Sequence, residues 1–308
     1  SSSSRLSMIT FPYLTEIIRR TNSKIIMVVV DGLGGMPNSD NGLSELEFAS
    51  TPNLDQLAQT SDCGVSTPVL PGITPGSGPG HLSLFGYDPI KHIIGRGTLE
   101  AFGAGSELKQ GEVAARGNFC TVDSSGLITD RRAGRISTSE CQRLCILLSA
   151  ITIPKTELSI IPGEGHRFTI IFKGAGLSPD ISSNDPQVTN TQPLKILASN
   201  NASELMLEIV EQFLNQAKEL LKQEQVANMV LLRGFSSIPQ IPSMACSYQL
   251  HPAAIAAYPM YRGLAQLIGM KVLPTGKTFQ QEIKTLKDNY SKYNFFFVHY
   301  KDADTAGE

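Results

Sequence analysis

The sequence has 308 residues, and its 26 basic and 28 acidic residues are scattered and give a net charge of −2, which excludes the basic surface typical of nucleic-acid-binding proteins. The five cysteines lack C-x-x-C spacing, and no apolar run approaches the roughly 20 residues that span a bilayer, so we expect a soluble, cytoplasmic protein that binds no membrane. This length exceeds one compact domain, which predicts two domains or one domain with a large insertion.

Residues 1–23 are an N-terminal extension that precedes the first strand signal. The leading serines are followed by a short amphipathic pattern, in which Leu14, Ile17 and Ile18 lie on one side of a helix that would open at Pro12. We assign no catalytic residue to this extension.

The first predicted strand is a continuous apolar run over residues 24–30, and it ends abruptly in Asp31 followed by a glycine-rich turn. Ligands of α/β proteins bind beyond the carboxyl ends of the strands, so a carboxylate at this place is a candidate metal ligand. An aspartate that only forms the turn would give the same local sequence.

Thr51 and Pro52 predict the start of a helix. Further along the chain, a glycine- and proline-rich loop over residues 72–81 contains Ser77. Glycines on both sides of the serine allow a phosphoryl group to approach the backbone closely. No Lys-Ser/Thr pair follows the glycines, so the loop is not a P-loop and gives no indication of ATP binding. Ser77 is therefore a candidate nucleophile, although a merely flexible glycine loop would have the same composition.

The middle of the chain departs from the alternation of strands and helices that marks both ends. Its predicted elements are a hairpin at 114–129, a strand at 167–173, a long helix at 203–222 and a strand at 229–232. The alternation predicts an α/β core with a mostly parallel sheet, made of residues 24–108 and 246–308. Residues 109–245 would then be an inserted α+β domain.

The last predicted strand, residues 294–299, runs into an acidic segment that contains Asp304 and Glu308. An i, i+4 spacing places both carboxylates on one side of a helical turn. Together with Asp31 and Ser77 they offer the hard oxygen ligands that a divalent ion needs, and an ion bound to the serine oxygen would favour the alkoxide. Taken alone, the two acidic residues would also fit an exposed tail.

Several arginines of the predicted insertion lie at strand ends or beside glycines. Planar guanidinium groups bind carboxylate and phosphate in bidentate fashion, which suits a small, doubly anionic substrate. A single arginine is more often a solvated surface residue, so the hypothesis depends on the group. The candidates are Arg116, Arg131, Arg132, Arg135, Arg167 and Arg233.

Seven segments, in this order, have the motifs of a known family. They are residues 28–34 (VVVDGLG), 51–57 (TPNLDQL), 75–89 (PGSGPGHLSLFGYDP), 115–119 (ARGNF), 130–135 (DRRAGR), 256–264 (AAYPMYRGL) and 299–308 (HYKDADTAGE). Together they resemble the archaeal-type, cofactor-independent phosphoglycerate mutases of the alkaline phosphatase superfamily, and the resemblance covers residues 24–308.

The resemblance implies an alkaline-phosphatase-like core with two divalent ions, Mn²⁺ or Mg²⁺, an inserted substrate-binding lid, and no 2,3-bisphosphoglycerate cofactor. It implies that Ser77 accepts the phosphoryl group of 3-phosphoglycerate and returns it to the 2-hydroxyl of glycerate. The implied metal ligands are Asp31, Ser77, Asp304 and Glu308. The implied substrate-binding residues are Arg116, Arg132, Arg135, Arg233, Arg262 and Lys301.

Members of that family continue beyond the position of Glu308 into an Asp-His pair and a further histidine that complete both metal sites. We therefore expect this chain to be a C-terminally truncated core. Two alternatives stay open: a metal-dependent phosphomonoesterase or phosphotransferase acting on another small alcohol, and an inactive anion-binding fragment. Release of phosphate from 3-phosphoglycerate would indicate the first, and the absence of bound metal in the complete protein would indicate the second. The sequence also leaves open whether the chain forms a homo-oligomer.

Overall fold

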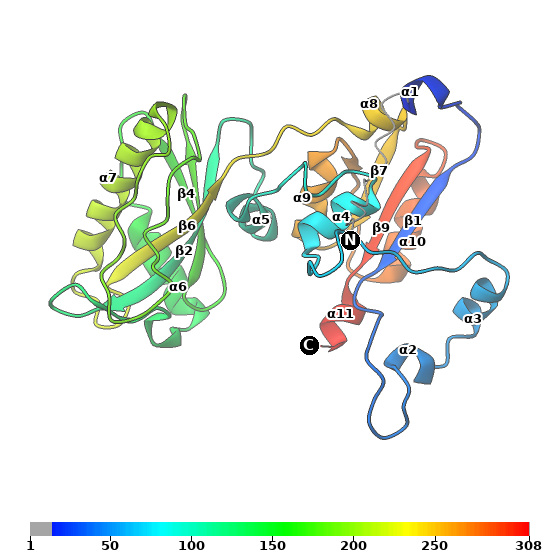
Figure 1. The fold of residues 1–308 in the computed structure, drawn as a ribbon, viewed down its shortest axis with the longest axis horizontal. Helices are drawn as coiled ribbons and strands as arrows, with labels where there is room; N and C mark the ends of the chain where they lie inside the picture. The colour runs from blue at the N-terminus through cyan, green and yellow to red at the C-terminus, as the bar shows by residue number, and fades with distance from the viewer. Residues whose placement is uncertain (1–13, 308) are drawn as a thin grey trace, which may run out of the picture. The chain divides into compact units, whose positions relative to one another are not determined.

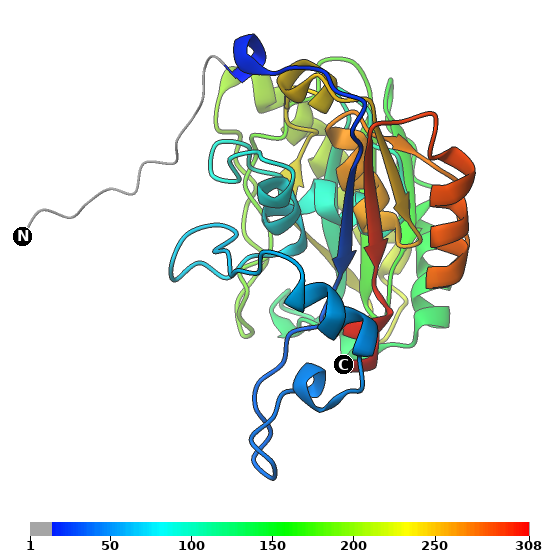
Figure 2. The ribbon, with the colours of Figure 1, turned by 90° about the vertical axis from the view of Figure 1, so that its right-hand side faces the viewer.

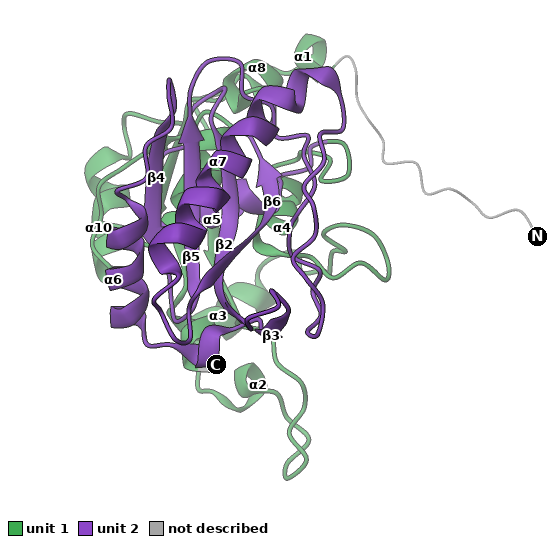
Figure 3. Ribbon diagram, turned by 90° about the vertical axis from the view of Figure 1, so that its left-hand side faces the viewer, with its two compact units in different colours: residues 1–91, 241–308 green, residues 92–240 purple. Residues whose placement is uncertain are grey.

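The computed structural model describes residues 14–307, which form two compact units (Figures 1 and 3). Unit 1 consists of the chain up to Lys91 and from Ile241 onward, and unit 2 consists of residues 92–240. Unit 2 begins earlier than the insertion predicted at residues 109–245, because helix α5 (Arg96–Gly103) packs on the sheet of that unit.

Unit 1 is built on a four-stranded parallel sheet, which confirms the predicted α/β core. Its strands in spatial order are β1 (Ile25–Val30), β9 (Phe295–Tyr300), β7 (Pro252–Ala256) and β8 (Lys271–Val272). Strands β1 and β9 lie side by side in Figure 2 and pair in register, with Val30 opposite Tyr300. Because the strands are parallel, the residues that follow them, Asp31 and Lys301, lie next to each other at one edge of the sheet.

Unit 1 also contains helices, some of which pack on this sheet. Those of unit 1 are α1 (Leu14–Ile17), α2 (Glu45–Phe48), α3 (Pro52–Gln59), α4 (Ser77–Leu84), α8 (Met244–Tyr248), α9 (Pro259–Leu267), α10 (Phe279–Asn289) and α11 (Asp302–Gly307). Helix α9 packs on β7 and on α4, while α10 packs on β7 and β9. Helix α3 begins at Pro52, as predicted. Helix α1 lies within the predicted N-terminal helix, whereas Pro12 and the rest of residues 1–13 lie outside the described residues.

Unit 2 contains an antiparallel sheet with β2 at its centre (Figure 3). The strands are β2 (Val113–Val122), β3 (Ile128–Asp130), β4 (Glu157–Pro162), β5 (Arg167–Lys173) and β6 (Met229–Ser236). The other helical elements of the unit are η1 (Ala133–Arg135), α6 (Thr138–Leu148), η2 (Asn201–Ser203) and α7 (Glu204–Leu221). Helices α6 and α7 bury their apolar sides against the sheet, which gives the unit a hydrophobic core of its own. Within residues 14–307, no helix has the length and apolar composition needed to cross a membrane.

Candidate active site

Asp31 lies at the carboxyl end of β1, where its backbone N–H donates to the carbonyl of Tyr300 at 2.9 Å. Its Oδ2 accepts a hydrogen bond from the Tyr261 hydroxyl at 2.8 Å, and it lies 3.4 Å from Nε2 of His299 and 3.7 Å from Nζ of Lys301. Burial acts to raise the pKa of Asp31, but the Tyr261 hydrogen bond and the neighbouring positive charge outweigh it, so this pKa lies below its usual value. The carboxylate is therefore ionised and held from several sides.

Ser77 is the first residue of α4, and its side chain is exposed. Its hydroxyl is hydrogen-bonded to the hydroxyl of Tyr261, the same group that donates to Asp31. Its carbonyl oxygen is 2.8 Å from Nδ1 of His81, one helical turn along the chain. The structure thus brings Asp31 and Ser77, which are predicted site residues from distant segments, to one tyrosine.

The glycine- and proline-rich segment is more regular than predicted, because α4 already starts at Ser77 rather than after a loop. Pro79 is tolerated there since the first N–H groups of a helix have no partner within the helix. A serine at this position lies at the positive end of the helix dipole, which favours a negatively charged group beside its hydroxyl.

Asp304 lies in α11, directly against the turn that follows β1: a Cβ atom placed on Gly32 would be 2.4 Å from the Asp304 Cα. The ammonium group of Lys301 is hydrogen-bonded to the Asp304 carboxylate and also faces Asp31. The structure therefore gathers Asp31, Asp304 and Lys301, while Glu308 lies outside the described residues.

Three residues of the site were not predicted: Tyr261, His81 and His299. The ring of Tyr261 stacks on the ring of His299 with a distance of 3.6 Å between the ring centroids, and both His81 and His299 are buried. Burial, followed by the nearby His81, lowers the pKa of His299 to about 4, so this imidazole is neutral at pH 7. Tyr261 lies in the segment 256–264 that was already recognised, but only its three-dimensional contacts reveal its place between Asp31 and Ser77.

The donors in unit 1 fit a hard divalent ion in kind, since Asp31 and Asp304 offer carboxylates and Ser77 offers a hydroxyl. Nε2 of His81 is buried and has no hydrogen-bond partner, so this nitrogen is a further atom that could bind an ion. In the part of the chain that the structure describes, however, no group of three or more His, Cys, Asp or Glu side chains is arranged as a metal site. The predicted two-ion centre therefore stays a prediction.

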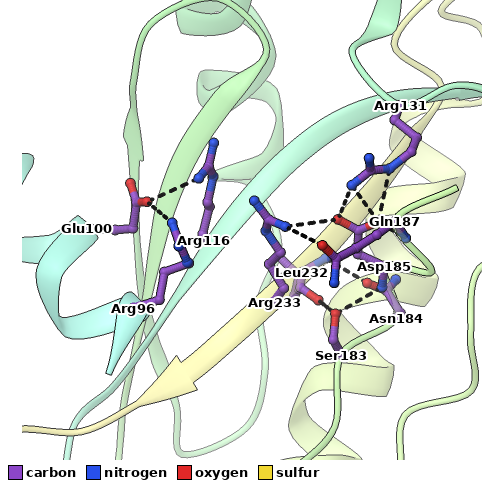
Figure 4. A network of polar contacts seen from close by, with 10 residues as sticks. All are labelled: Arg96, Glu100, Arg116, Arg131, Ser183, Asn184, Asp185, Gln187, Leu232 and Arg233. Carbon is purple, nitrogen blue, oxygen red and sulfur yellow. Dashed lines mark hydrogen bonds and ion pairs between the residues drawn. The ribbon is translucent and has the colours of Figure 1, made fainter. Parts of the chain in front are cut away.

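The arginines of unit 2 form a network of their own (Figure 4). Arg116 on β2 lies opposite Arg233 on β6, and both are only partly accessible to solvent. Oε1 of Glu100 on α5 lies 3.5 Å from Nη1 of Arg116, and Oδ2 of the buried Asp185 lies 4.0 Å from Nη1 of Arg233. Burial lowers the pKa of Arg116, and other arginines around it act in the same direction. Because the two guanidinium groups lie side by side and have few acidic neighbours, they favour the binding of an additional anion.

The other predicted arginines are placed differently. Arg132 and Arg135 are exposed residues of the turn after β3, where the Asp130 carboxylate accepts hydrogen bonds from the backbone N–H groups of Arg132 and Gly134 at 2.7 and 2.8 Å. Arg262 is exposed on α9 in unit 1, next to Tyr261 in the sequence. Of the predicted substrate-binding residues, the structure therefore pairs only Arg116 with Arg233, and it places Lys301 at Asp31.

Known proteins resemble this chain over most of its length. A family model described as "2,3-bisphosphoglycerate-independent phosphoglycerate mutase" matches residues 58–227. A Thermus thermophilus protein named "Probable 2,3-bisphosphoglycerate-independent phosphoglycerate mutase" is 47% identical over 304 residues, which covers 97% of this chain and 75% of that protein. An Aquifex aeolicus protein of the same name is 46% identical over 305 residues and covers 96% of this chain and 75% of its own length. The solved cofactor-independent phosphoglycerate mutase from Thermoplasma acidophilum matches with a TM-score of 0.74 and 29% identity, covering 92% of this chain and 80% of that one.

Proposed function

Because this chain belongs to the family of 2,3-bisphosphoglycerate-independent phosphoglycerate mutases, we propose that it interconverts 3-phosphoglycerate and 2-phosphoglycerate through a phosphoserine at Ser77. The family acts without 2,3-bisphosphoglycerate, so no such cofactor supplies the phosphoryl group and a protein side chain can carry it between the two hydroxyls. The observation that carries the proposal is the exposed Ser77 hydroxyl at the start of α4, which is linked through Tyr261 to Asp31.

The proposed reaction has two displacements. Ser77 Oγ attacks the phosphorus of 3-phosphoglycerate, the bond from phosphorus to the substrate 3-oxygen breaks, and that oxygen takes up a proton while Ser77 loses one. The 2-hydroxyl of the retained glycerate then attacks the phosphoserine and loses its proton, the bond from phosphorus to Oγ breaks, and Ser77 Oγ takes up a proton. The N-terminal end of α4 favours the negative phosphoryl group in both steps.

We further propose that Asp31, Ser77, Asp304 and Glu308 hold divalent ions, Mn²⁺ or Mg²⁺. When bound, such ions supply charge neutralisation at the phosphoryl group and a lower pKa for the serine hydroxyl. The kind of donor supports this assignment, because carboxylate and hydroxyl oxygens are the preferred ligands of both ions.

The arginines are proposed to bind the two anionic groups of phosphoglycerate. In unit 2 the argument depends on the pair of Arg116 and Arg233, whose adjacent charges would be relieved by a carboxylate or phosphate. Arg132, Arg135, Arg262 and Lys301 complete the set by resemblance. A cytoplasmic location and a small-molecule substrate as the partner, instead of a nucleic acid or a membrane, are also part of the proposal.

Replacing Ser77 tests the covalent route. With Mn²⁺ supplied, Ser77→Ala should abolish interconversion, whereas Ser83→Ala, on the same helix, should leave it unchanged. Mass spectrometry of the wild-type protein quenched during turnover should locate a phosphoryl group on Ser77. Turnover by Ser77→Ala would overturn the covalent route, and release of inorganic phosphate without 2-phosphoglycerate would favour a phosphomonoesterase instead.

A further inference from the structure

Tyr261 connects the two residues on which the proposed chemistry depends. Its hydroxyl donates to Oδ2 of Asp31 at 2.8 Å, and because that proton is committed, the same oxygen accepts the proton of the Ser77 hydroxyl. The three groups thus form one hydrogen-bond chain that runs from Ser77 through Tyr261 to Asp31. All three belong to unit 1.

The tyrosine ring is fixed in place. Only 4% of Tyr261 is exposed, and its ring stacks on His299 at a centroid distance of 3.6 Å and an interplanar angle of 21°. His81 lies against the same ring at 4.8 Å. A ring packed on two buried imidazoles cannot change rotamer without disturbing the core, so its hydroxyl is a rigid point between the serine and the aspartate.

A rigid acceptor determines where the serine points. An exposed serine has three staggered χ1 rotamers, and a hydrogen bond to a fixed partner favours one of them. When the Ser77 proton is directed at Tyr261, the lone pairs of Oγ are left for the incoming phosphorus. On Asp31 the same tyrosine occupies Oδ2, so Oδ1 remains for another ligand.

We propose that Tyr261 is a positioning residue that orients the Ser77 hydroxyl and the Asp31 carboxylate for phosphoryl transfer. This inference rests on the proposed function, since it assumes that Ser77 is the nucleophile. Tyr261 does not itself touch the reacting phosphorus. It acts through two other residues, as outer-shell groups do around reactive centres.

A double-mutant cycle on unfolding tests the hydrogen-bond chain without substrate or metal. The wild type, Tyr261→Phe, Ser77→Ala and the double variant are unfolded with urea. Each single variant loses the hydrogen bond between Ser77 and Tyr261, whereas the double variant loses it only once. One hydrogen bond changes the equilibrium constant of unfolding about fivefold, so the product of the two single changes in this constant should exceed the change in the double variant by about that factor. A tyrosine that only packs would give independent effects, and that result would overturn the inference.

Kinetics test the role. In the presence of Mn²⁺, Tyr261→Phe should lower kcat by about 10–100-fold with little change in KM, because substrate binding is intact while the nucleophile is misoriented. The matched control is Tyr290→Phe, which removes the hydroxyl of a half-exposed tyrosine at the end of α10. If both variants turn over equally fast, or if the loss lies entirely in KM, the positioning role is overturned. A wild-type chain that interconverts nothing would instead overturn the proposed function, and the unfolding cycle would still report on the hydrogen-bond chain.

Discussion

Gly32 lies so close to Asp304 that no side chain fits between them: a Cβ atom on Gly32 would lie 2.4 Å from the Cα of Asp304. Gly32 also has a φ of +73°, a left-handed conformation that other residues adopt only with strain. The glycine after Asp31 therefore lets the end of β1 and helix α11 approach each other, which brings the two carboxylates to the same edge of the sheet.

Replacing Gly32 by alanine should push α11 away from the turn. The left-handed conformation alone should cost about 1–2 kcal/mol in the free energy of unfolding, measured with urea, and the collision with Asp304 should add to it. Mutase activity should fall together with stability, because Asp304 is displaced from Asp31. The matched control is Gly34→Ala, since a Cβ atom at that position meets nothing within 4 Å. Equal effects of the two substitutions would contradict this role of Gly32.

Lys301 should set the acid stability of this edge of the sheet. Burial acts to raise the pKa of Asp31, but the hydrogen bond from Tyr261 and the charge of Lys301 outweigh it, and the pKa lies below the ordinary value of 3.8. A carboxyl group whose pKa is lower in the folded state stabilises the fold above its unfolded pKa, and this contribution is lost as the pH falls through the folded value. Lys301→Met should therefore raise the pKa of Asp31 and make acid unfolding begin at a higher pH.

Circular dichroism during acid titration measures this shift. The control is Lys284→Met on α10, which removes an exposed lysine that pairs with Asp288 on the surface. Surface pairs of this kind contribute little, so the control should unfold at the wild-type pH. Acid unfolding of both variants at the same pH would show that Lys301 does not stabilise the Asp31 carboxylate.

The sequence was sufficient to predict the strand that ends in Asp31 and the acidic segment after the last strand, because continuous apolar runs mark buried parallel strands. It could not show that β1 and β9 are neighbours, since pairing between strands so far apart in the chain depends on the whole fold. The start of α4 was also missed. The Ser-Gly-Pro-Gly segment has low helix propensity, and tertiary packing against α9 overrides it.

The same limit applies to the side chains of the site. The pattern of residues identified Ser77 and Asp31, whereas Tyr261 was recognised only as part of the segment 256–264. Similarly, the density of arginines predicted an anion-binding group, but the strand register that places Arg116 opposite Arg233 cannot be read from spacing. Asp185 was not considered, because a single aspartate in a loop carries no sequence signal for its partners.

Asp185 should be the main counter-charge of the arginine network in unit 2. It is 4% exposed, and its carboxylate accepts hydrogen bonds from Nη2 of Arg131 at 3.0 and 3.1 Å while facing Arg233 (Figure 4). Asp185→Asn leaves both guanidinium groups without their buried partner, so the free energy of unfolding should fall by about 3 kcal/mol in urea titrations. KM for phosphoglycerate should also change, since Arg233 loses the group that faces it.

The control for Asp185 is Asp288→Asn, which neutralises the exposed partner of Lys284. This substitution should change the free energy of unfolding by less than about 1 kcal/mol. If Asp185→Asn were as mild as the control, the buried carboxylate would not be what holds the arginines together.

Glu282 should make the protein less stable as the pH rises through neutrality. This residue of α10 is 1% exposed, and its Oε2 has no hydrogen-bond partner. Burial raises the pKa of its carboxyl group from 4.5 to about 7, and the negative charge of Asp302 acts in the same direction, although the backbone N–H of Ala257 opposes both. Between pH 4.5 and about 7 the folded chain therefore keeps a proton on Glu282 that the unfolded chain has released. The free energy of unfolding declines over this pH range and is lowest above the pKa of the folded state.

Glu282→Gln removes this titration. Above pH 7 the variant should be more stable than the wild type by up to about 3 kcal/mol, since each unit of pKa difference corresponds to about 1.4 kcal/mol, and near pH 4.5 the difference should disappear. Urea unfolding at several pH values measures this, with Glu211→Gln as the control because that glutamate lies exposed on α7. A constant difference between Glu282→Gln and the wild type at every pH would mean that the carboxyl group does not titrate inside the fold, and that its contribution is one of packing alone.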